Sequence, residues 1–336
     1  MSDLKLTVAV ENLAFKASFR IAGFVFDHQD AVLVTLSDGA QHGRGEACGV
    51  FYLGDNAERM VAAIELRRRE IEKGVDRDSL QQLLPPGGAR NALDCALWEL
   101  DARRSSKPVW ELAGLRSPKP LMTTFTLSAD SPAVMAEGAL RYAKAQALKI
   151  KLTGELELDI ERVNAVRRAR PDAWLAIDAN QGYTIGKLPQ LIEHLVDARV
   201  ELVEQPLARG HEAELEGFSS PIPIFADESV LGLADVPGLV GRFNGINIKL
   251  DKCGGLTEGL AMAREARRLG LDVMVGNMMG TSLAMAPAFL LGQLCDVVDL
   301  DGPIFLAHDR EPGVIYADGM ITCDEAVWGR DQGRHS

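Results

Sequence analysis

The chain has 336 residues, 47% of them hydrophobic and 25% charged, a composition typical of a globular protein with room for one large domain and a smaller one. Its formal net charge of -12 argues against nucleic acid and anionic membranes as partners, because phosphate groups are bound by cationic surfaces. Five scattered cysteines without a Cys-x-x-Cys pair, no apolar leader and no long apolar run predict a cytoplasmic protein with reduced thiols.

The N-terminal part of the chain shows the alternation of a β-meander. Residues 4–10 and 31–36 alternate apolar and polar side chains, which predicts two strands, and Asp38-Gly39 is a hairpin turn signal. We expect residues 18–23 to form a loop between these strands. The glycine-rich stretch 43–54 is interpreted as a connector, part of which could serve as a lid.

Helical patterns follow these strands. Asp55 is expected to cap a helix that continues to about residue 73, and a Pro-Pro-Gly-Gly break at 85–88 precedes a second helix over 89–102. A short turn follows at 108–114. Strands followed by helices make residues 1–115 an α+β unit.

Eight apolar runs after residue 120 are predicted to be strands, at 122–127, 147–152, 175–180, 201–204, 222–227, 246–250, 272–276 and 296–301. Helix-like segments separate most of them, at 131–146, 155–170, 185–199, 257–269 and 281–294. This alternation implies parallel pairing, and eight strands suggest closure into a barrel. The fold class is therefore α/β, a modified (β/α)7β TIM-type barrel over residues 116–310 with an α+β capping domain. A hairpin is expected at 314–322, and residues 311–336 are expected to pack back on the capping domain.

Charged and amide side chains stand at the ends of these strands, where a parallel barrel places its active site. They are Lys149, Lys151, Asp178, Glu204, Asp227, Lys249, Asn277, Asp299 and Asp301. Three of them, Asp178, Glu204 and Asp227, are carboxylates on consecutive strands. Such oxygen ligands suit a hard cation such as Mg²⁺. The sequence thus predicts one Mg²⁺ site per subunit, with Mn²⁺ as a substitute.

The lysines predict acid–base chemistry. Lys149 and Lys151 lie on the same side of their strand, because side chains repeat every second residue, and Lys249 comes from the opposite wall four strands later. Two lysines facing each other across a metal could move protons on both faces of one carbon, and we expect lowered pKa values for them. Glu228 and Asp251 are expected to orient the lysines. For Asn180 a supporting role and a loop role remain equally open.

Five ordered motifs resemble those of the enolase superfamily, within its muconate lactonizing enzyme subgroup. They are Lys149-Ile-Lys151, Asp178-Ala-Asn180, Glu204-Gln-Pro206, Asp227-Glu-Ser229 and Lys249-Leu-Asp-Lys-Cys-Gly-Gly255. The resemblance covers nearly the whole chain. It implies that Asp178, Glu204 and Asp227 ligate Mg²⁺. It also implies that Lys151 and Lys249 are the acid/base catalysts and that Lys149 stabilises the enolate.

A sixth motif, Asp299-Leu-Asp301, resembles the Asp-x-Asp pair with which dipeptide epimerases receive the substrate's ammonium group. The resemblance therefore implies a Mg²⁺-dependent dipeptide epimerase. Lid loops near 20–24 and 50–55 would contact the distal part of the substrate. Arg20 would hold a side-chain carboxylate, as in an Ala-Glu epimerase, or simply end a strand.

Tyr52 and Asn277 complete the set of residues expected to bind substrate. The alternatives are racemisation of an N-acyl amino acid such as N-acetylglutamate, a muconate-type cycloisomerisation or dehydration at the same site, and a non-catalytic binding barrel. The expected partner is a small carboxylate substrate, and we expect a homo-oligomer.

Overall fold

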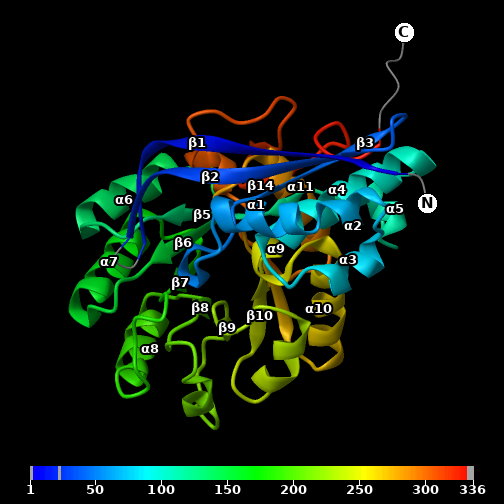
Figure 1. Cartoon of the computed structure of the whole chain (residues 1–336). Coiled ribbons are helices and arrows are strands. Elements are labelled where there is room, and N and C mark those ends of the chain that lie inside the picture. Colours follow the sequence, from blue (N-terminus) through cyan, green and yellow to red (C-terminus); the bar gives the residue numbers. More distant parts are fainter. Residues whose placement is uncertain (1–2, 22–23, 331–336) are drawn as a thin grey trace.

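The computed structural model describes residues 3–21 and 24–330, without the side chains of residues 19–24. An eight-stranded parallel sheet with the order β12-β11-β10-β9-β8-β7-β6-β5 forms a nearly closed barrel. A three-stranded antiparallel sheet, β1-β2-β3, lies across it with helix α4 (Gly88–Ser105) (Figure 1). The predicted fold class, a TIM-type barrel with an α+β cap, is confirmed.

The barrel strands occur where the sequence predicts them, each shorter by one to several residues. They are β5 (Thr124–Leu127), β6 (Ala147–Lys151), β7 (Trp174–Asp178), β8 (Leu202–Glu204), β9 (Ile224–Ala226), β10 (Gly245–Ile248), β11 (Asp272–Val275) and β12 (Val297–Val298). The first predicted strand is divided, because residues 121–122 form β4 (Leu121–Met122). β4 pairs with the confirmed C-terminal hairpin of β13 (Ile315–Ala317) and β14 (Met320–Thr322).

The helices between the strands cover the outside of the barrel. They are α6 (Pro132–Arg141), α7 (Leu156–Ala169), α8 (Leu188–Asp197), α10 (Leu256–Arg268) and α11 (Ser282–Gly292), whereas the short helices α9 (Leu250–Cys253) and α12 (Gly302–Phe305) follow the ends of β10 and β12. Two crossovers carry short 3-10 segments instead, η2 (Glu212–Leu215) and η3 (Leu233–Leu239). Since their strands still pair in parallel, the barrel order is unaffected.

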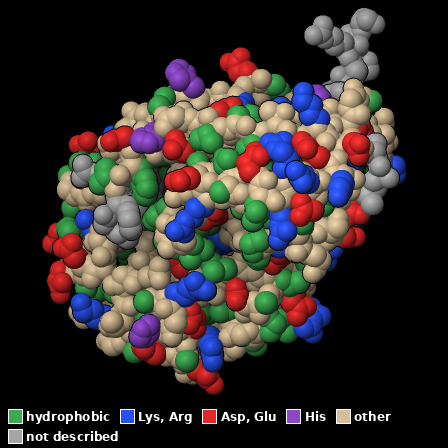
Figure 2. Space-filling view, in the orientation of Figure 1, with side chains coloured by type: hydrophobic (Ala, Val, Ile, Leu, Met, Phe, Trp, Pro, Cys, Tyr) green, Lys and Arg blue, Asp and Glu red, His purple; other side chains and the backbone are tan. Residues whose placement is uncertain are grey.

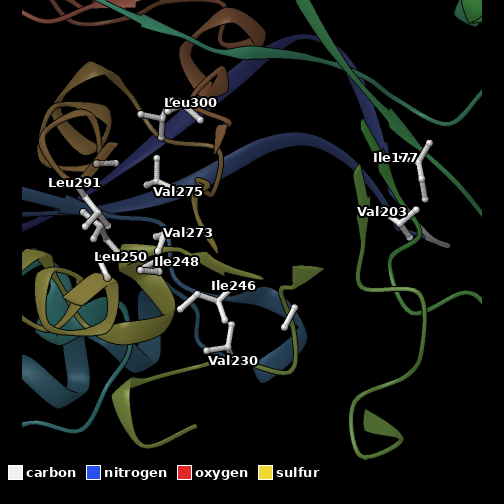
Figure 3. Close-up of a cluster of buried hydrophobic side chains, with 14 of the residues drawn as sticks. Ile177, Val203, Val230, Ile246, Ile248, Leu250, Val273, Val275, Leu291 and Leu300 are labelled. Carbon is white, nitrogen blue, oxygen red and sulfur yellow. The ribbon is translucent and has the colours of Figure 1, made fainter. Parts of the chain in front are cut away.

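Strand alternation separates the barrel into an apolar outside and a layered inside. Ile246 and Ile248 of β10 point outward into the core beneath the helices, close to Leu250 and Leu291 (Figure 3). Inside, the barrel floor is a separate buried cluster, formed by Ala176, Leu202, Phe225 and Met274. The next inward positions, two residues further along three of these strands, are the predicted metal ligands. The sequence thus places carboxylates directly above an apolar floor.

Side chains from the strand ends join β5 to β12, the two end strands of the sheet. Thr124 Oγ1 donates to Asp299 Oδ1 at 2.6 Å, and Thr126 N donates to Asp301 Oδ2 at 2.7 Å. Leu300 N donates to Thr123 Oγ1 at 3.0 Å. Both carboxylates of the Asp-x-Asp motif therefore help to hold the seam of the barrel.

The capping sheet corrects two expectations. Of residues 18–23, predicted as a loop, residues 18–21 continue β1 (Lys5–Ile21), which pairs with β2 (Phe24–Ser37), and residues 22–23 lie outside the described residues. The stretch 43–54 is not a plain connector, because β3 (His42–Ala47) pairs with β2 along its length. Its glycines serve packing: a Cβ on Gly43 or Gly45 would lie 2.0 Å from a carbonyl oxygen of α4.

The remaining cap helices are α1 (Ala57–Leu66), α2 (Arg68–Glu72), α3 (Arg77–Leu83) and α5 (Val109–Leu112), with the 3-10 turn η1 (Phe51–Leu53) before them. Asn56, rather than the predicted Asp55, caps α1 by accepting from Arg59 N at 3.0 Å. Asp55 instead accepts from Gly88 N at 2.8 Å, at the start of α4. Buried side chains of α1, α2 and α3 form a cluster distinct from the barrel core, whereas Val109 of α5 packs with the barrel core.

Helix α4 docks the cap on the chain that follows β10. Arg90 donates to the carbonyl oxygen of Cys253 at 2.5 Å and forms an ion pair with Glu258. Asp94 accepts from Thr257 N at 2.9 Å. The cap is therefore anchored on the segment that directly follows Lys249.

Asp94 should leave a measurable pH signature on stability. Burial raises its pKa to about 6, whereas an unfolded aspartate titrates near pH ~3.9. Its stabilising contribution is thus present below pH ~4 and is lost as the pH rises through 6. Urea unfolding should show the stability of Asp94→Asn gaining up to about 3 kcal/mol on the wild type between pH ~4 and ~7. A difference that does not change with pH would contradict this.

The end of the chain and the surface complete the description. Trp328 Nε1 donates to Arg44 O at 3.0 Å, and Arg44 in turn donates to Val327 O at 2.9 Å, so these residues lie against β3. On the face seen in Figure 2, acidic and basic side chains are interspersed. In the part of the chain that the structure describes, every helix is too short or too polar to cross a bilayer.

Candidate active site

Three buried carboxylates meet at the mouth of the barrel. Asp178, Glu204 and Asp227 stand at or just after the ends of β7, β8 and β9, and each offers an oxygen within 4.8 Å of the others. Asn247 Nδ2 donates to Glu204 Oε1 at 2.7 Å, and Asn180 N donates to Asp178 Oδ1 at 3.0 Å. These two hydrogen bonds orient the carboxylates of Asp178 and Glu204 within the barrel mouth.

Burial and neighbouring lysines divide the pKa values of the three acids. Burial raises the pKa of Asp178, but the charges of Lys151 and Lys149 outweigh it, so the net shift is downward. For Glu204, burial and then the charge of Asp178 raise the pKa to about 7. For Asp227, burial opposes but Lys249 lowers the pKa well below its usual range. Of these three acids, Glu204 therefore has the highest pKa and binds a proton most readily.

The three predicted lysines are paired with these acids. Lys151 Nζ donates to Asp178 Oδ2 at 2.6 Å, and Lys249 Nζ donates to Asp227 Oδ2 at 2.6 Å. Lys149 Nζ lies 2.6 Å from Glu204 Oε2 in an ion pair, and Glu204 Oε2 accepts no hydrogen bond from the part of the chain that the structure describes. Because Lys151 belongs to β6 and Lys249 follows β10, the two lysines reach the acid triad from separate walls, each at a different acid.

Among the protein's own charges alone, the pKa values of two of the three lysines are raised; the expected lowering, which assumed a dication bound beside them, stays a prediction. Burial does push the pKa of Lys249 downward, but the charges of Asp227 and Glu204 outweigh it and leave the pKa raised. Burial also pushes the pKa of Lys149 downward, but the neighbouring acids, Asp299 most strongly, outweigh it and leave the pKa raised. Within the protein's own charge set, both are ammonium groups, which can donate a proton before they accept one.

A fourth lysine, Lys252, belongs to the site and was missed by the sequence analysis. Its Nζ donates to Asp227 Oδ1 at 2.5 Å, to Asp227 O at 2.6 Å and to Asn247 O at 3.0 Å. It lies in α9, beyond the strand, so strand periodicity could not place it. Its only sequence signal is its position inside the motif that begins at Lys249. With Lys249 on the other oxygen, both oxygens of Asp227 are held.

The Asp-x-Asp pair lies beside Lys149. Lys149 Nζ donates to Asp299 Oδ2 at 2.8 Å, and Asn277 Nδ2 donates to Asp299 O at 2.6 Å. Burial and the nearby charge of Asp299 raise the pKa of Asp301 to about 7. One carboxylate of the pair is thus ion-paired within the protein, and the other is the weaker acid.

One pocket joins these groups. Its polar lining includes Lys149, Lys151, Asp227, Lys249, Asn277, Asp299 and Asp301, as the sequence predicts, while Asp178 and Glu204 lie fully buried. Its apolar wall is formed by Phe15, Phe26, Phe51, Met278 and Met279. Tyr52 lines the pocket as expected, and its buried hydroxyl group has no hydrogen-bond partner within residues 3–18 and 25–330. The side chain of Arg20 lies outside the described residues.

The expected supporting residues behave differently from one another. Glu228 and Asn180 both line the pocket, and Asn180 Nδ2 approaches Glu228 Oε1 at 3.5 Å. Burial, with the charge of Asp227, raises the pKa of Glu228 to about 7. Asp251 does not fit the expectation that it orients a lysine: its carboxylate accepts from the backbone of Cys48 and Gly49 in the cap. Its partners therefore lie in the other structural unit.

A capped barrel with acids on three successive strands and lysines on both sides defines a class of enzyme. Residues 4–114 match the family model "Mandelate racemase / muconate lactonizing enzyme, N-terminal domain", and residues 133–326 match "Enolase C-terminal domain-like". The chain belongs to this family, the mandelate racemase/muconate lactonizing enzyme group of the enolase superfamily.

Particular members are similar over most of their length. The chain is 41% identical over 292 residues to an L-Ala-D/L-Glu epimerase of Escherichia coli, covering 86% of this chain and 90% of that protein. It is 40% identical over 262 residues to an N-acetyl-D-glutamate racemase of Pseudoalteromonas, covering 78% and 82%. A Methylococcus capsulatus dipeptide epimerase complexed with Mg and L-Arg-D-Lys superposes with a TM-score of 0.88 at 30% identity, covering 96% and 97%.

Proposed function

We propose that the protein is a Mg²⁺-dependent dipeptide epimerase. It inverts the α-carbon next to the free carboxylate, because one lysine removes the α-proton and a second lysine delivers a proton to the opposite face. The observation that carries the proposal is the arrangement of Lys151 and Lys249 on separate walls around one buried acid triad. Similarity to epimerases that act on L-Ala-D/L-Glu supports the substrate class. Such an enzyme is an isomerase.

The acid triad fits a magnesium ion. Asp178, Glu204 and Asp227 offer only oxygen ligands, which Mg²⁺ prefers, and the buried Glu204 Oε2 accepts no hydrogen bond from the described residues. A Mg²⁺ ion bound there supplies electrostatic stabilisation of the negative charge that develops on the substrate carboxylate. Lys252 keeps the Asp227 carboxylate oriented from behind.

The lysines carry the proton steps. With substrate between the two walls, one lysine in its neutral form takes the α-proton, and the electron pair of the C–H bond moves into the carboxylate to give an enediolate. The ammonium of the other lysine returns a proton to the opposite face of the same carbon. The reverse reaction exchanges the two roles. Lys149, ion-paired with Glu204 and Asp299, adds positive charge beside the developing anion.

The remaining pocket residues are proposed to bind the rest of the dipeptide. Asp299 and Asp301 would face the ammonium group, with Asn277 supporting Asp299 through its backbone oxygen. The segments 20–24 and 50–55 would act as lids, the second of them carrying Tyr52. We also place the protein in the cytoplasm, in keeping with its five free cysteines.

Racemisation of N-acetylglutamate is the second candidate, and one observation favours it. Asp299 is already paired with Lys149 and Thr124, and the pKa of Asp301 is raised to about 7, so the pair offers less negative charge to an ammonium group than two free carboxylates would. An acylated amino group has no positive charge and would need none. The Pseudoalteromonas relative has this activity in its name.

A direct comparison of two substrates tests the proposal. The protein with Mg²⁺ is incubated with L-Ala-L-Glu and, separately, with N-acetyl-L-glutamate, and the products are separated by chiral chromatography. We expect L-Ala-D-Glu from the first, and Asp301→Ala should weaken that reaction more than any turnover of the second. Turnover of N-acetylglutamate alone, insensitive to Asp301→Ala, would favour the second candidate and contradict the first.

A further inference from the structure

Two buried carboxylates, one from the cap and one from the barrel, connect these two units at the end of β3. Asp251, from the barrel, accepts on Oδ1 from the backbone N–H groups of Cys48 at 2.8 Å and Gly49 at 2.9 Å. In the opposite direction Glu46, from the cap, accepts from Thr281 N at 2.7 Å and Thr281 Oγ1 at 2.6 Å. The end of β3 is therefore tied to two neighbouring strand ends of the barrel.

The turn that Asp251 holds leads directly into the pocket wall. Gly49 has a φ of +69°, and a Cβ there would lie 2.3 Å from Asp55 O, so the backbone at this turn has little freedom. Phe51 and Tyr52 follow within three residues, and both line the pocket. Their placement over the polar lining depends on where the amides of Cys48 and Gly49 are fixed.

The segment of the barrel that carries Asp251 also carries Lys249. Lys249 precedes α9 at its N-terminal cap position, and Asp251 is two residues further along in α9. The Tyr52 hydroxyl is buried with no hydrogen-bond partner among the described residues, and burial followed by the charge of Asp227 raises its pKa. The tyrosine is thus turned toward the acids rather than toward solvent.

We propose that Asp251 is a positioning residue that fixes the aromatic segment 50–53 of the cap over Lys249 through the Cys48 and Gly49 amides. Its kinetic consequence rests on the proposed epimerase function, whereas its structural consequence does not. The role belongs to the acceptor oxygen and not to the negative charge, because a single oxygen accepts both bonds.

This distinction makes asparagine the informative replacement. Asp251→Asn keeps an oxygen that can accept from both amides, whereas Asp251→Ala leaves two buried N–H groups without an acceptor. Asp38→Ala is the matched control. Asp38 also accepts on one oxygen from two backbone amides, of Ala40 at 3.0 Å and Gln41 at 2.8 Å, in a cap turn that does not line the pocket.

Hydrogen–deuterium exchange on the full-length protein measures the contact without any substrate. In Asp251→Ala, we expect the Cys48 and Gly49 amides to exchange at least about tenfold faster, with exchange in the barrel strands unchanged. In Asp251→Asn, the two rates should stay within about threefold of the wild type. Asp38→Ala should accelerate exchange only in its own turn.

Steady-state kinetics with L-Ala-L-Glu then tests the consequence for the site. Asp251→Ala should raise KM about tenfold or more, and Asp251→Asn should restore it to near the wild-type value. Loss of protection in Asp251→Asn would overturn the proposal even if Asp251→Ala fails to fold, because the charge would then be what matters. Unchanged exchange at Cys48 and Gly49 in a folded Asp251→Ala would overturn it as well. If no epimerisation is found, the exchange result still decides.

Discussion

Replacing Lys249 by methionine is expected to abolish epimerisation in both directions, by roughly 10²–10⁴-fold or more, because each direction needs both lysines. Methionine keeps the length of the side chain and removes only the group that moves the proton. Lys252 Nζ still donates to Asp227 Oδ1 at 2.5 Å in this variant, so the Asp227 carboxylate should stay in place. The rate of conversion of each isomer is followed by chiral chromatography.

A single remaining lysine still leaves a partial reaction. In D₂O, Lys249→Met should exchange the α-proton of one isomer without inverting it, and Lys151→Met should do the same for the other isomer. This reciprocal behaviour separates two-base chemistry from a cycloisomerisation or dehydration, in which one lysine suffices. Inversion by either variant at a rate near that of the wild type would contradict the assignment.

Replacing Glu204 by glutamine should have the second largest effect, because it changes a metal ligand itself. We expect Mg²⁺ binding to weaken more than ~100-fold, a larger loss than is caused by replacing residues that only contact a metal ligand. Glutamine keeps the shape and removes one of the three negative charges. Magnesium should therefore stabilise the wild type against unfolding, by about 2.7 kcal/mol at 100 times the Kd, and leave Glu204→Gln unaffected.

Two measurements check this effect without relying on activity. Titration calorimetry gives the Kd for Mg²⁺, and thermal melts with and without the ion give the stabilisation. Asp172→Asn is a suitable control, since this carboxylate pairs with Arg170 outside the pocket. If Glu204→Gln bound Mg²⁺ as tightly as the wild type, the triad would not be the metal site.

Much of the site could be read from the sequence, because strand alternation is a local property. Ala176, Leu202 and Phe225 form the floor, and the acids two residues beyond them must point the same way. Once the runs were recognised as parallel strands, the gathering of these acids and lysines followed from the barrel itself. The pattern needed no knowledge of contacts between distant residues.

The features that the sequence did not predict depend on such contacts. Asp251 meets Cys48 across 203 positions of the chain, so no local pattern assigns its partner. Lys252 lies on a helical turn, where the strand rule no longer holds. β3 was obscured by glycines, which weaken a strand signal but here let α4 approach.

The lysine pKa values show the same limit for electrostatics. The sequence supplied a count of lysines and acids but not the distances that decide which charge dominates. In the structure Lys149 is within reach of three carboxylates, at 2.6 to 3.4 Å, and these outweigh the cost of burial. The pKa of a buried lysine therefore cannot be predicted without the positions of all the charges around it.

The most direct test of the account is to follow L-Ala-L-Glu in D₂O with the wild-type protein and Mg²⁺, by mass spectrometry and chiral chromatography together. We predict that each molecule of L-Ala-D-Glu formed carries one solvent deuterium at the inverted α-carbon. This result requires that the α-proton leaves and that a different, solvent-derived proton arrives on the other face. Product that retains its α-protium throughout, or no inversion by a folded, Mg²⁺-loaded protein, would contradict two-lysine epimerisation.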